Sequence, residues 1–206
     1  MTGNTAPNRR KAPKQPRARE SRERILTAAA QLFAERGIAD TSTNRIAAHA
    51  GMSIGSLYRY FADKDEIVGV LRDRLLAELE ERFAETVRAG MTLSTRESVA
   101  ASLHAIVDVV SAREGLVRAL SAAAAVPGFG LLGLERRLLV LTRAYLLHRL
   151  GPCPEDELDA KALVMVTTGL AAALRITLGP AATADRELVI TETATMIGGW
   201  LEPSAR

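Results

Sequence analysis

The sequence predicts an all-α protein of about nine helices. Alanine and leucine abound while aromatic residues make up only 4% of the chain, a composition that favours helix over strand. Apolar residues recur at helical spacing, and no segment shows sustained alternation with a period of two. The hydrophobic fraction of 48% is sufficient for a buried core, and the one cysteine, Cys153, excludes an internal disulfide and a cysteine-rich zinc site.

The positive charge is concentrated at the N-terminus. Residues 1–24 hold eight basic side chains and only two acidic ones, whereas the whole chain has a net charge of +3, so the remainder is acidic. Residues 1–18 lack apolar periodicity and are predicted to form a disordered basic arm. An arm of this kind is typical of proteins that bind a polyanion, and nucleic acid is the first candidate. The alternative role is that of a solubilising tail. If it meets DNA, Arg17 and Arg19 are candidates for entering the minor groove, as basic arms of other DNA-binding proteins do.

Apolar periodicity predicts helix one from about Glu20 to the left-handed cap at Gly37. A second helix is expected over 44–50, with Thr43 as its N-cap and Gly51 at its end. Ser53 is then expected to cap a short third helix that reaches about Tyr60.

A long fourth helix is predicted to link two domains. Asp63 caps it, with Glu66 completing an aspartate variant of the capping box. Its apolar residues recur every four positions to about Val87. We therefore expect a DNA-binding domain over 19–66, a linking helix to about 87, and an effector-binding and dimerisation domain over 88–206.

The second half predicts five further helices from start and stop signals. The signals are the capping boxes Ser94–Glu97 and Ser111–Glu114, the stop at Pro127-Gly128, a helix over 131–150 closed by Gly151-Pro152, a start at Pro154 running to Leu178, a cap at Thr183 and an end near Gly198-Gly199.

Helices two and three are separated only by Gly51-Met52, the spacing of a helix-turn-helix. Gly51 permits the sharp turn, and the helix that begins at Ser53 would place its N-terminal residues in the DNA major groove.

The residues around this turn resemble the DNA-binding signature of the TetR/AcrR family of transcription regulators. The resemblance covers about residues 20–70, and the matching positions are Thr43, Ile46-Ala47, Ala50-Gly51, Ser53, Leu57-Tyr58, Phe61 and Lys64. It implies a dimer that binds a pseudo-palindromic operator and responds to a small molecule.

Three side chains are candidates for holding the DNA backbone. Thr43 offers a hydroxyl and free N–H groups at a helix start, Tyr58 a phenol, and Lys64 a charge. The family resemblance implies the same roles. Thr43 would also act as an ordinary helix cap. The alternative for Tyr58 is that it is a half-buried core tyrosine.

Base recognition is expected from the exposed face of the third helix, with help from the second. Ile54 has no polar atom, so a thymine methyl is its expected partner, whereas Arg59 is either a base contact or a solvated charge. The candidates are Asn44, Arg45, Ser53, Ile54, Gly55, Ser56, Arg59 and Tyr60.

The second half matches no chemical motif, so its roles follow from the resemblance. The expected effector pocket is mostly apolar, and each of its candidates could equally be core: Leu103, His104, Val107, Leu116, Leu120, Leu138, Leu141, Tyr145 and Met165. The expected dimer interface uses small residues and one tryptophan, with purely intramolecular contacts as the alternative: Gly169, Ala172, Ala173, Thr193, Ala194, Gly198 and Trp200.

Other classes of function fit less well. The three histidines are too far apart in sequence for a metal-binding spacing, so we expect no catalytic residue, metal or cofactor. The strongly apolar run 162–174 is shorter than the roughly 20 residues of a membrane span, so we expect no membrane association. We expect the protein to be in the reducing cytoplasm, associated with the nucleoid. Repression is the expected role. Activation and non-specific DNA binding stay open.

Overall fold

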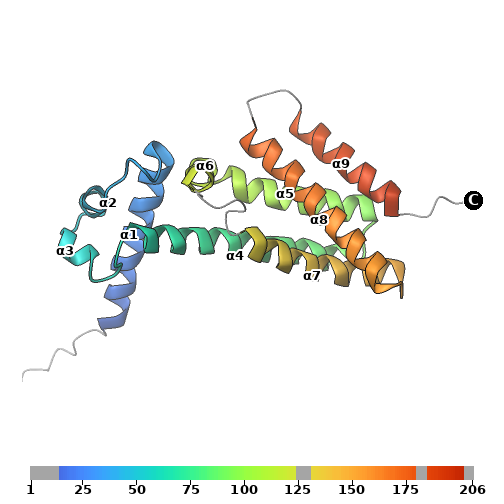
Figure 1. The fold of residues 1–206 in the computed structure, drawn as a ribbon, viewed down its shortest axis with the longest axis horizontal. Coiled ribbons are helices and arrows are strands. Elements are labelled where there is room, and N and C mark those ends of the chain that lie inside the picture. The colour runs from blue at the N-terminus through green and yellow to red at the C-terminus, as the bar shows by residue number, and fades with distance from the viewer. Residues whose placement is uncertain (1–13, 124–130, 180–184, 202–206) are drawn as a thin grey trace, which may run out of the picture.

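The computed structural model describes residues 14–123, 131–179 and 185–201, which form nine helices and no strand. The all-α prediction is therefore confirmed for this part of the chain. Figure 1 shows a small lobe of α1 to α3, a larger helical lobe, and α4 running through both. The helices are α1 (Lys14–Arg36), α2 (Thr43–His49), α3 (Ile54–Leu57), α4 (Lys64–Gly90), α5 (Thr95–Ser111), α6 (Glu114–Ala123), α7 (Leu131–Leu150), α8 (Glu155–Leu178) and α9 (Arg186–Leu201).

The small lobe is held by large apolar side chains that meet where α1, α2, α3 and α4 converge. Phe33, Phe61 and Ile67 are buried there at 0–1% exposure, and each fully buried side chain of this size contributes about 1.5–3 kcal/mol. Because the elements are so short, this shared core is what fixes the position of α2 and α3.

Helix α4 connects the two lobes. Its residues Ile67, Leu71, Leu75 and Leu79 are buried at the predicted spacing of four. At about 1.5 Å per residue, its 27 residues extend for roughly 40 Å. Asp63 caps it as predicted, accepting from the N–H of Glu66 at 2.8 Å. The Glu66 carboxylate accepts from the N–H of Ala62 rather than of Asp63.

In the larger lobe, α5 lies between α4 on one side and α8 and α9 on the other. Its N-terminus carries the predicted capping box, in which the Glu97 carboxylate accepts from the N–H of Ser94 at 2.9 Å. Helix α7 packs against α8 and α4, and α6 packs against α1 of the small lobe.

The prediction of a disordered arm is wrong for residues 14–18, which form the N-terminal end of α1. Arg17 and Arg19 therefore lie on a helix and are exposed. Arginine, alanine and glutamate are good helix formers, and Pro16 is tolerated in a first turn whose N–H groups have no helical acceptors. The rest of the arm lies outside the described residues.

Two predicted boundaries in the larger lobe are wrong. Ser111 ends α5 instead of capping α6, which begins at Glu114. Helix α9 continues through Gly198-Gly199 to Leu201. Gly198 lets α9 pack closely on α5, since a Cβ there would lie 3.2 Å from the Cβ of Arg96, so this glycine is a packing residue and does not end the helix. The proposed stop at Pro127-Gly128 and cap at Thr183 lie outside the described residues.

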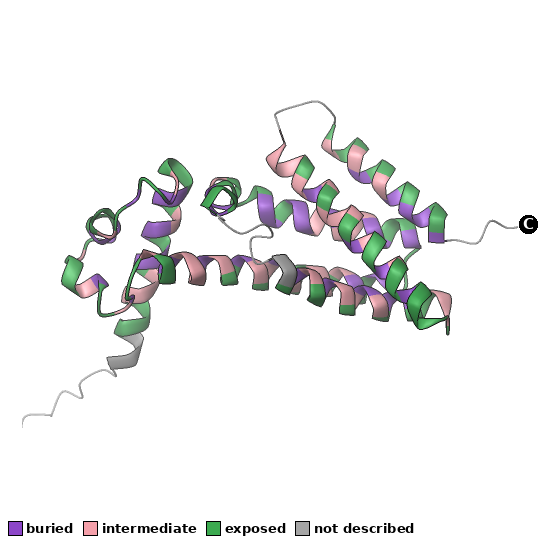
Figure 2. Ribbon diagram, viewed as in Figure 1, coloured by how far each residue is buried: buried purple, intermediate pink, exposed green. Residues whose placement is uncertain are grey.

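Helix α8 differs from expectation in another respect. By length and composition it is apolar enough to cross a membrane, although its strongly apolar run is short. In the structure it packs against α5, α7 and α9, and three acidic residues occupy its first turn. Its outward side, shown largely green in Figure 2, is exposed.

Candidate functional site

The turn between α2 and α3 has the geometry that the sequence predicts. Gly51 adopts φ +66°, a left-handed conformation that other residues rarely take. The side chain of Arg24 on α1 donates to the carbonyls of Ala50 at 2.5 Å and Gly51 at 3.3 Å. This arginine, which sequence reasoning missed, attaches the turn to α1. Its position one residue before the buried pair Ile25-Leu26 gave no signal of that role.

Helix α3 begins at the predicted cap, where the Ser53 hydroxyl accepts from the N–H of Ser56 at 3.2 Å. The helix itself ends at Leu57, and hydrogen-bonded turns continue it to Phe61. Leu57 is fully buried, whereas Ile54, Gly55 and Arg59 are exposed. The short element therefore presents its outer face to solvent.

Thr43 and Tyr58 form a pair across the helix-turn-helix. The Thr43 hydroxyl lies 3.1 Å from the Tyr58 phenol oxygen, and Tyr58 is 52% exposed. The cap of α2 is Ser42, which accepts from the N–H of Arg45 at 3.3 Å. The prediction that Thr43 is the cap is therefore wrong by one residue, and its hydroxyl is left to face Tyr58.

Lys64 does not join this pair. Its ammonium donates to the carbonyl of Ile38 at 2.6 Å. Ile38 lies just after α1, so this hydrogen bond links the start of α4 to the connection between α1 and α2. Arg45 is exposed and donates to the carbonyl of Asp40 at 3.1 Å, and Asn44 is exposed beside it.

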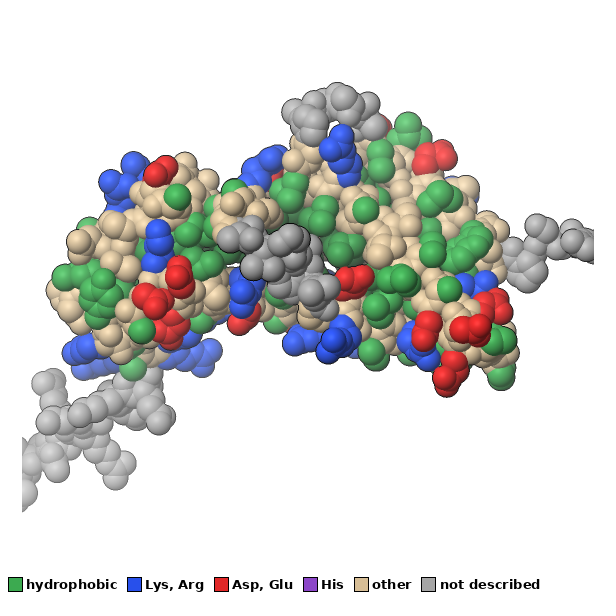
Figure 3. Space-filling view, in the orientation of Figure 1, with side chains coloured by type: hydrophobic (Ala, Val, Ile, Leu, Met, Phe, Trp, Pro, Cys, Tyr) green, Lys and Arg blue, Asp and Glu red, His purple; other side chains and the backbone are tan. Residues whose placement is uncertain are grey.

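The side chains of the remaining base-reading candidates contact neighbouring residues of the same element. The guanidinium of Arg59 lies 5.8 Å from the ring centre of Tyr60, which is half-buried. The hydroxyls of Ser53 and Ser56 are 2.9 Å apart and bind each other. Figure 3 shows basic side chains along the rim of this lobe.

An ion pair missed by the sequence reasoning joins α1 to α4. Two nitrogens of Arg74 lie 2.6 Å from the two carboxylate oxygens of Glu23. This hydrogen-bonded guanidinium lowers the pKa of Glu23 from its ordinary value of 4.5. Because both groups are more than 40% exposed, the pair positions the helices more than it stabilises them.

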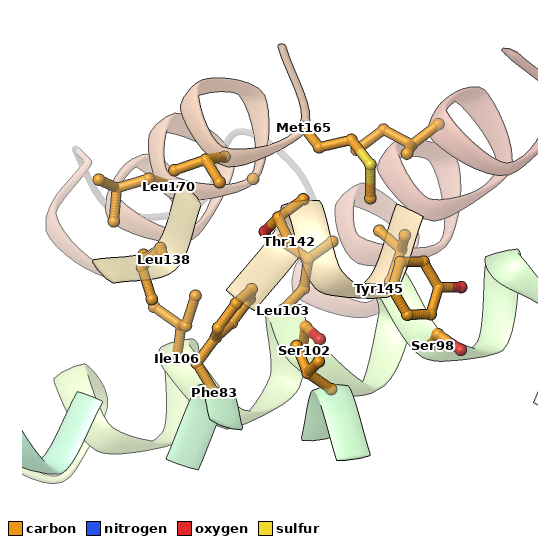
Figure 4. Close-up of a pocket in the computed structure, with 15 residues that line it drawn as sticks. Phe83, Ser98, Ser102, Leu103, Ile106, Leu138, Thr142, Tyr145, Met165 and Leu170 are labelled. Carbon is orange, nitrogen blue, oxygen red and sulfur yellow. The ribbon is translucent and has the colours of Figure 1, made fainter. Parts of the chain in front are cut away.

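The larger lobe contains a cavity of about 50 Å³ between α4, α5, α7 and α8 (Figure 4). Four of the predicted residues line it: Leu103, Leu138, Tyr145 and Met165. Those that sequence reasoning missed are Phe83, Val87, Ser98, Val99, Ser102, Ile106, Thr142, Val166, Gly169, Leu170 and Ile197. The available signal for Ser98 and Ser102 was two serines four residues apart, on the helix face that also carries apolar residues.

Five of the predicted pocket residues do not line this cavity. Val107, Leu116 and Leu120 are buried in the core, and Leu141 is half-buried against it. His104 points toward α9, where its Nε2 lies 2.9 Å from the Glu187 carboxylate. Hydrogen bonding to that carboxylate raises the pKa of His104 above 6.5. Adjacent helical residues diverge by about 100°, so Leu103 and His104 face different neighbours.

Tyr145 stands out among the cavity-lining residues. It is 3% exposed, and its phenol oxygen is buried without a hydrogen-bond partner. The Ser102 hydroxyl, by contrast, lies 3.0 Å from that of Thr86, and the Ser98 hydroxyl is 3.0 Å from the carbonyl of Gly90. Buried polar groups are rarely left unpaired, so this phenol is an exception in the described part of the larger lobe.

Three of the predicted interface residues, Ala173, Ala194 and Gly198, are buried inside the subunit. Gly169, Ala172 and Thr193 are half-buried, and Trp200 is exposed. The apolar surface lies instead on the outer sides of α8 and α9, where Figure 3 shows hydrophobic side chains. We call this surface the α8/α9 face, and its large exposed members are Leu163, Val164, Leu188, Met196 and Trp200.

Within the described ranges no group of three or more His, Cys, Asp and Glu side chains lies close enough together to hold a metal ion.

The N-terminal part of the chain matches a known family. Residues 25–71 match the TetR_N model, described as bacterial regulatory proteins of the tetR family. The chain is 43% identical over 79 residues to an HTH-type transcriptional repressor of Mycobacterium tuberculosis (strain ATCC 25618 / H37Rv). The aligned region covers 38% of this chain and 41% of that protein. It is 46% identical over 50 residues to an HTH-type transcriptional regulator of Staphylococcus aureus (strain USA300), 24% of this chain and 27% of that one. The matches therefore span less than half the length of these relatives.

Solved structures extend the similarity over most of the chain. A TetR-family transcriptional regulator from Streptomyces coelicolor aligns with a TM-score of 0.63 at 27% identity, covering 89% of this chain and 97% of its own. A putative TetR-family transcriptional regulator from Mesorhizobium loti shares the fold with a TM-score of 0.66 at 16% identity, covering 90% and 96%. Residues 25–71 therefore match the tetR family of bacterial regulatory proteins in sequence, and the described helices share the fold of TetR-family regulators.

Proposed function

We propose that the protein is a dimeric, sequence-specific DNA-binding transcription regulator, a repressor that a small apolar effector releases from operator DNA in the cytoplasm, at the nucleoid. The observation that carries this proposal is the pair of Thr43, which is half-buried, and Tyr58, which is exposed, with oxygens 3.1 Å apart beside α3. Two neutral hydroxyls at the start of α2 and the end of α3 can contact one phosphate and orient α3 toward the groove.

The exposed face of α3 would then read bases. Ile54 and Gly55 lie at its tip and project from the lobe, so a thymine methyl and a close backbone approach are the expected contacts. Arg45 and Arg59, both exposed, flank this tip. Arg17 and Arg19 on α1 are available to the neighbouring backbone or minor groove. Lys64 would reach a phosphate only by releasing the carbonyl of Ile38.

We infer that the α8/α9 face binds a second copy of the chain. Met196 is 58% and Leu188 is 54% exposed, and an apolar surface of this kind marks an interaction site. Covering it with the same face of a partner gives a two-fold dimer, in which two copies of α3 read half-sites about 34 Å apart. A partner also accounts for the apolar outer side of α8.

Release would act through helices shared by the cavity and the DNA-binding lobe. Phe83 and Val87 of α4 line the cavity, and the same helix begins at Lys64 beside Ile38. An effector that favours a shifted α4 would favour a state in which the two copies of α3 no longer match the operator spacing. We assign DNA binding to residues 19–66 and effector binding with dimerisation to 88–206, joined by α4.

The test is selection of bound sites by the purified full chain, followed by affinity measurement on the selected duplex. We expect a pseudo-palindrome, and we expect Thr43→Val with Tyr58→Phe to weaken binding by about tenfold or more, since each lost hydrogen bond acts in both subunits. Thr92→Val, at the exposed α4–α5 loop, is the matched control. Unchanged affinity in the double variant would refute the proposed clamp.

Non-specific DNA binding is the alternative that this selection also addresses. A non-specific protein would enrich no palindrome, and its affinity would fall steeply with salt for every duplex alike. Activation would use the same interface, and transcription in vitro with and without the protein distinguishes it from repression.

A further inference from the structure

One buried hydroxyl of the larger lobe has a hydrogen-bonding capacity that the described residues leave unused. Four serine and threonine side chains in the described part of the chain are buried: Thr41, Thr95, Ser98 and Thr142. The first three each form a hydrogen bond within the protein, at 2.8, 3.1 and 3.0 Å. Thr142, on α7, is 3% exposed, and its hydroxyl makes no hydrogen bond to a residue that the structure describes.

This hydroxyl also lacks the acceptor that a helical threonine usually takes. A threonine inside a helix commonly donates to the carbonyl four residues earlier. Thr177 on α8 and Thr193 on α9 do so, at 2.8 and 2.7 Å. Thr142 forms no such bond with Leu138. Since a threonine hydroxyl both donates and accepts, either role is open to a ligand.

The position of Thr142 directs its hydroxyl into the cavity. The residue lines the cavity, and in Figure 4 it lies between Leu138 and Met165, in the middle of the row of side chains. The buried atoms that have neither a partner nor accessible surface are the Tyr145 phenol oxygen and Nε of Arg186. The Thr142 oxygen is not one of them, so it keeps accessible surface, which in so buried a residue opens into the cavity.

The rest of the cavity wall is uncharged and has its hydrogen bonds formed. None of the described lining residues carries a charged side chain. The Ser98 and Ser102 hydroxyls are already bonded, to the carbonyl of Gly90 and the hydroxyl of Thr86. Placing an unpaired charge in such surroundings is strongly unfavourable. A ligand that fits is therefore neutral, with one polar group opposite Thr142 and apolar groups on both sides of it.

We propose that Thr142 selects the effector, a neutral molecule such as a dialkyl ketone or a secondary alcohol, whose central oxygen hydrogen-bonds to the Thr142 hydroxyl. This assignment rests on the proposed function, because it names the chemical class of the effector and the residue that recognises it. At about 50 Å³ the cavity is smaller than the usual few hundred Å³ of a ligand pocket. Binding must therefore displace lining side chains, Met165 first, since methionine is unbranched and flexible.

The test compares three probes that share two propyl groups and differ at the centre. They are 4-heptanone, 2-propyl-1-pentene, in which a CH₂ group replaces the oxygen, and dipropylammonium, a cation at neutral pH. Each is titrated into the full-length, DNA-free protein, and the nuclear magnetic resonance signal of the Met165 methyl group reports occupancy of the cavity. We expect the ketone to bind, and the cation to bind at least about tenfold more weakly.

Variants of Thr142 then isolate the hydrogen bond. Thr142→Val keeps the shape of the side chain and removes the hydroxyl, so the affinity of the ketone relative to the alkene should fall by about two- to tenfold, the range of one hydrogen bond. Thr142→Ser keeps a hydroxyl and should retain the wild-type preference. Thr177→Val is the matched control, because the Thr177 hydroxyl bonds to the carbonyl of Ala173 and does not line the cavity. It should leave the preference unaltered.

The assignment is overturned if Thr142→Val keeps the wild-type preference for the ketone, if the cation binds as tightly as the ketone, or if no probe binds. Because these titrations contain no DNA, such a result with intact operator selection rejects only the effector class. Loss of operator selection with normal ketone binding rejects the regulator function instead.

Discussion

The contact between α6 and α1 provides a sharp test of how the two lobes are joined. Gly115, in the first turn of α6, faces Ala34 near the end of α1. A Cβ at residue 115 would lie 2.8 Å from the Cβ of Ala34, 3.2 Å from its Cα and 3.3 Å from its carbonyl oxygen. Carbon atoms in good contact are about 3.5–4.0 Å apart, and neither Ala34 nor its backbone can rotate away. Gly115→Ala must therefore push α6 away from α1 by close to 1 Å.

We expect Gly115→Ala to lower the free energy of unfolding by about 1–3 kcal/mol, the usual cost of overpacking. Urea unfolding followed by helical circular dichroism measures it, and operator affinity reports whether α1 has moved. The control is Gly69→Ala inside α4, where a Cβ meets nothing within 4 Å and helix propensity should add about 0.5–1 kcal/mol. Ala34→Gly in the Gly115→Ala background should recover part of the loss. The reasoning fails if Gly115→Ala is as harmless as Gly69→Ala, or if the two changes simply add.

Three further outcomes are expected. Tyr145→Phe should raise the free energy of unfolding of the unliganded protein by about 1 kcal/mol in urea titration, because it removes a buried hydroxyl that lacks a partner; a decrease would reveal a partner. His104→Gln should flatten the dependence of melting temperature on pH. Because Glu187 raises the pKa of His104 in the folded state, the contribution of this pair to stability is complete below pH 6.5 and is lost as pH rises through that raised pKa. A variant with the wild-type pH profile would exclude the pair. Met196→Glu, on the α8/α9 face, should shift the protein from dimer to monomer in sedimentation experiments, and an unaltered dimer would place the interface elsewhere.

The helix-turn-helix was predictable because its signals are local. Gly51 must adopt a positive φ, Ser53 must accept from an N–H three residues later, and Leu57 must be buried for so short a helix to hold its place. Each of these requirements depends on neighbours within a few residues. The pairing of Thr43 with Tyr58 was not predictable in detail, since the cap fell on Ser42 and freed the Thr43 hydroxyl.

The pocket and interface were less predictable because an apolar residue on a helix has the same sequence signature wherever it faces. Leu103 lines the cavity and Val107, one turn on, lies in the solid core. Small residues raised the same ambiguity: Gly198 allows α9 to approach α5 inside the subunit, where a dimer contact was expected.

The sequence by itself determined the all-α class, the order of the helices, and the turn that presents α3. Periodicity, caps and glycine conformations are properties of short stretches, which is why the residue order specifies them. Only the tertiary structure decided that Gly115 meets Ala34, that Lys64 is held by Ile38, and that a tyrosine hydroxyl is left without a partner beside the cavity. Those facts depend on how helices far apart in the chain approach one another, and that approach is set by the packing of the whole core.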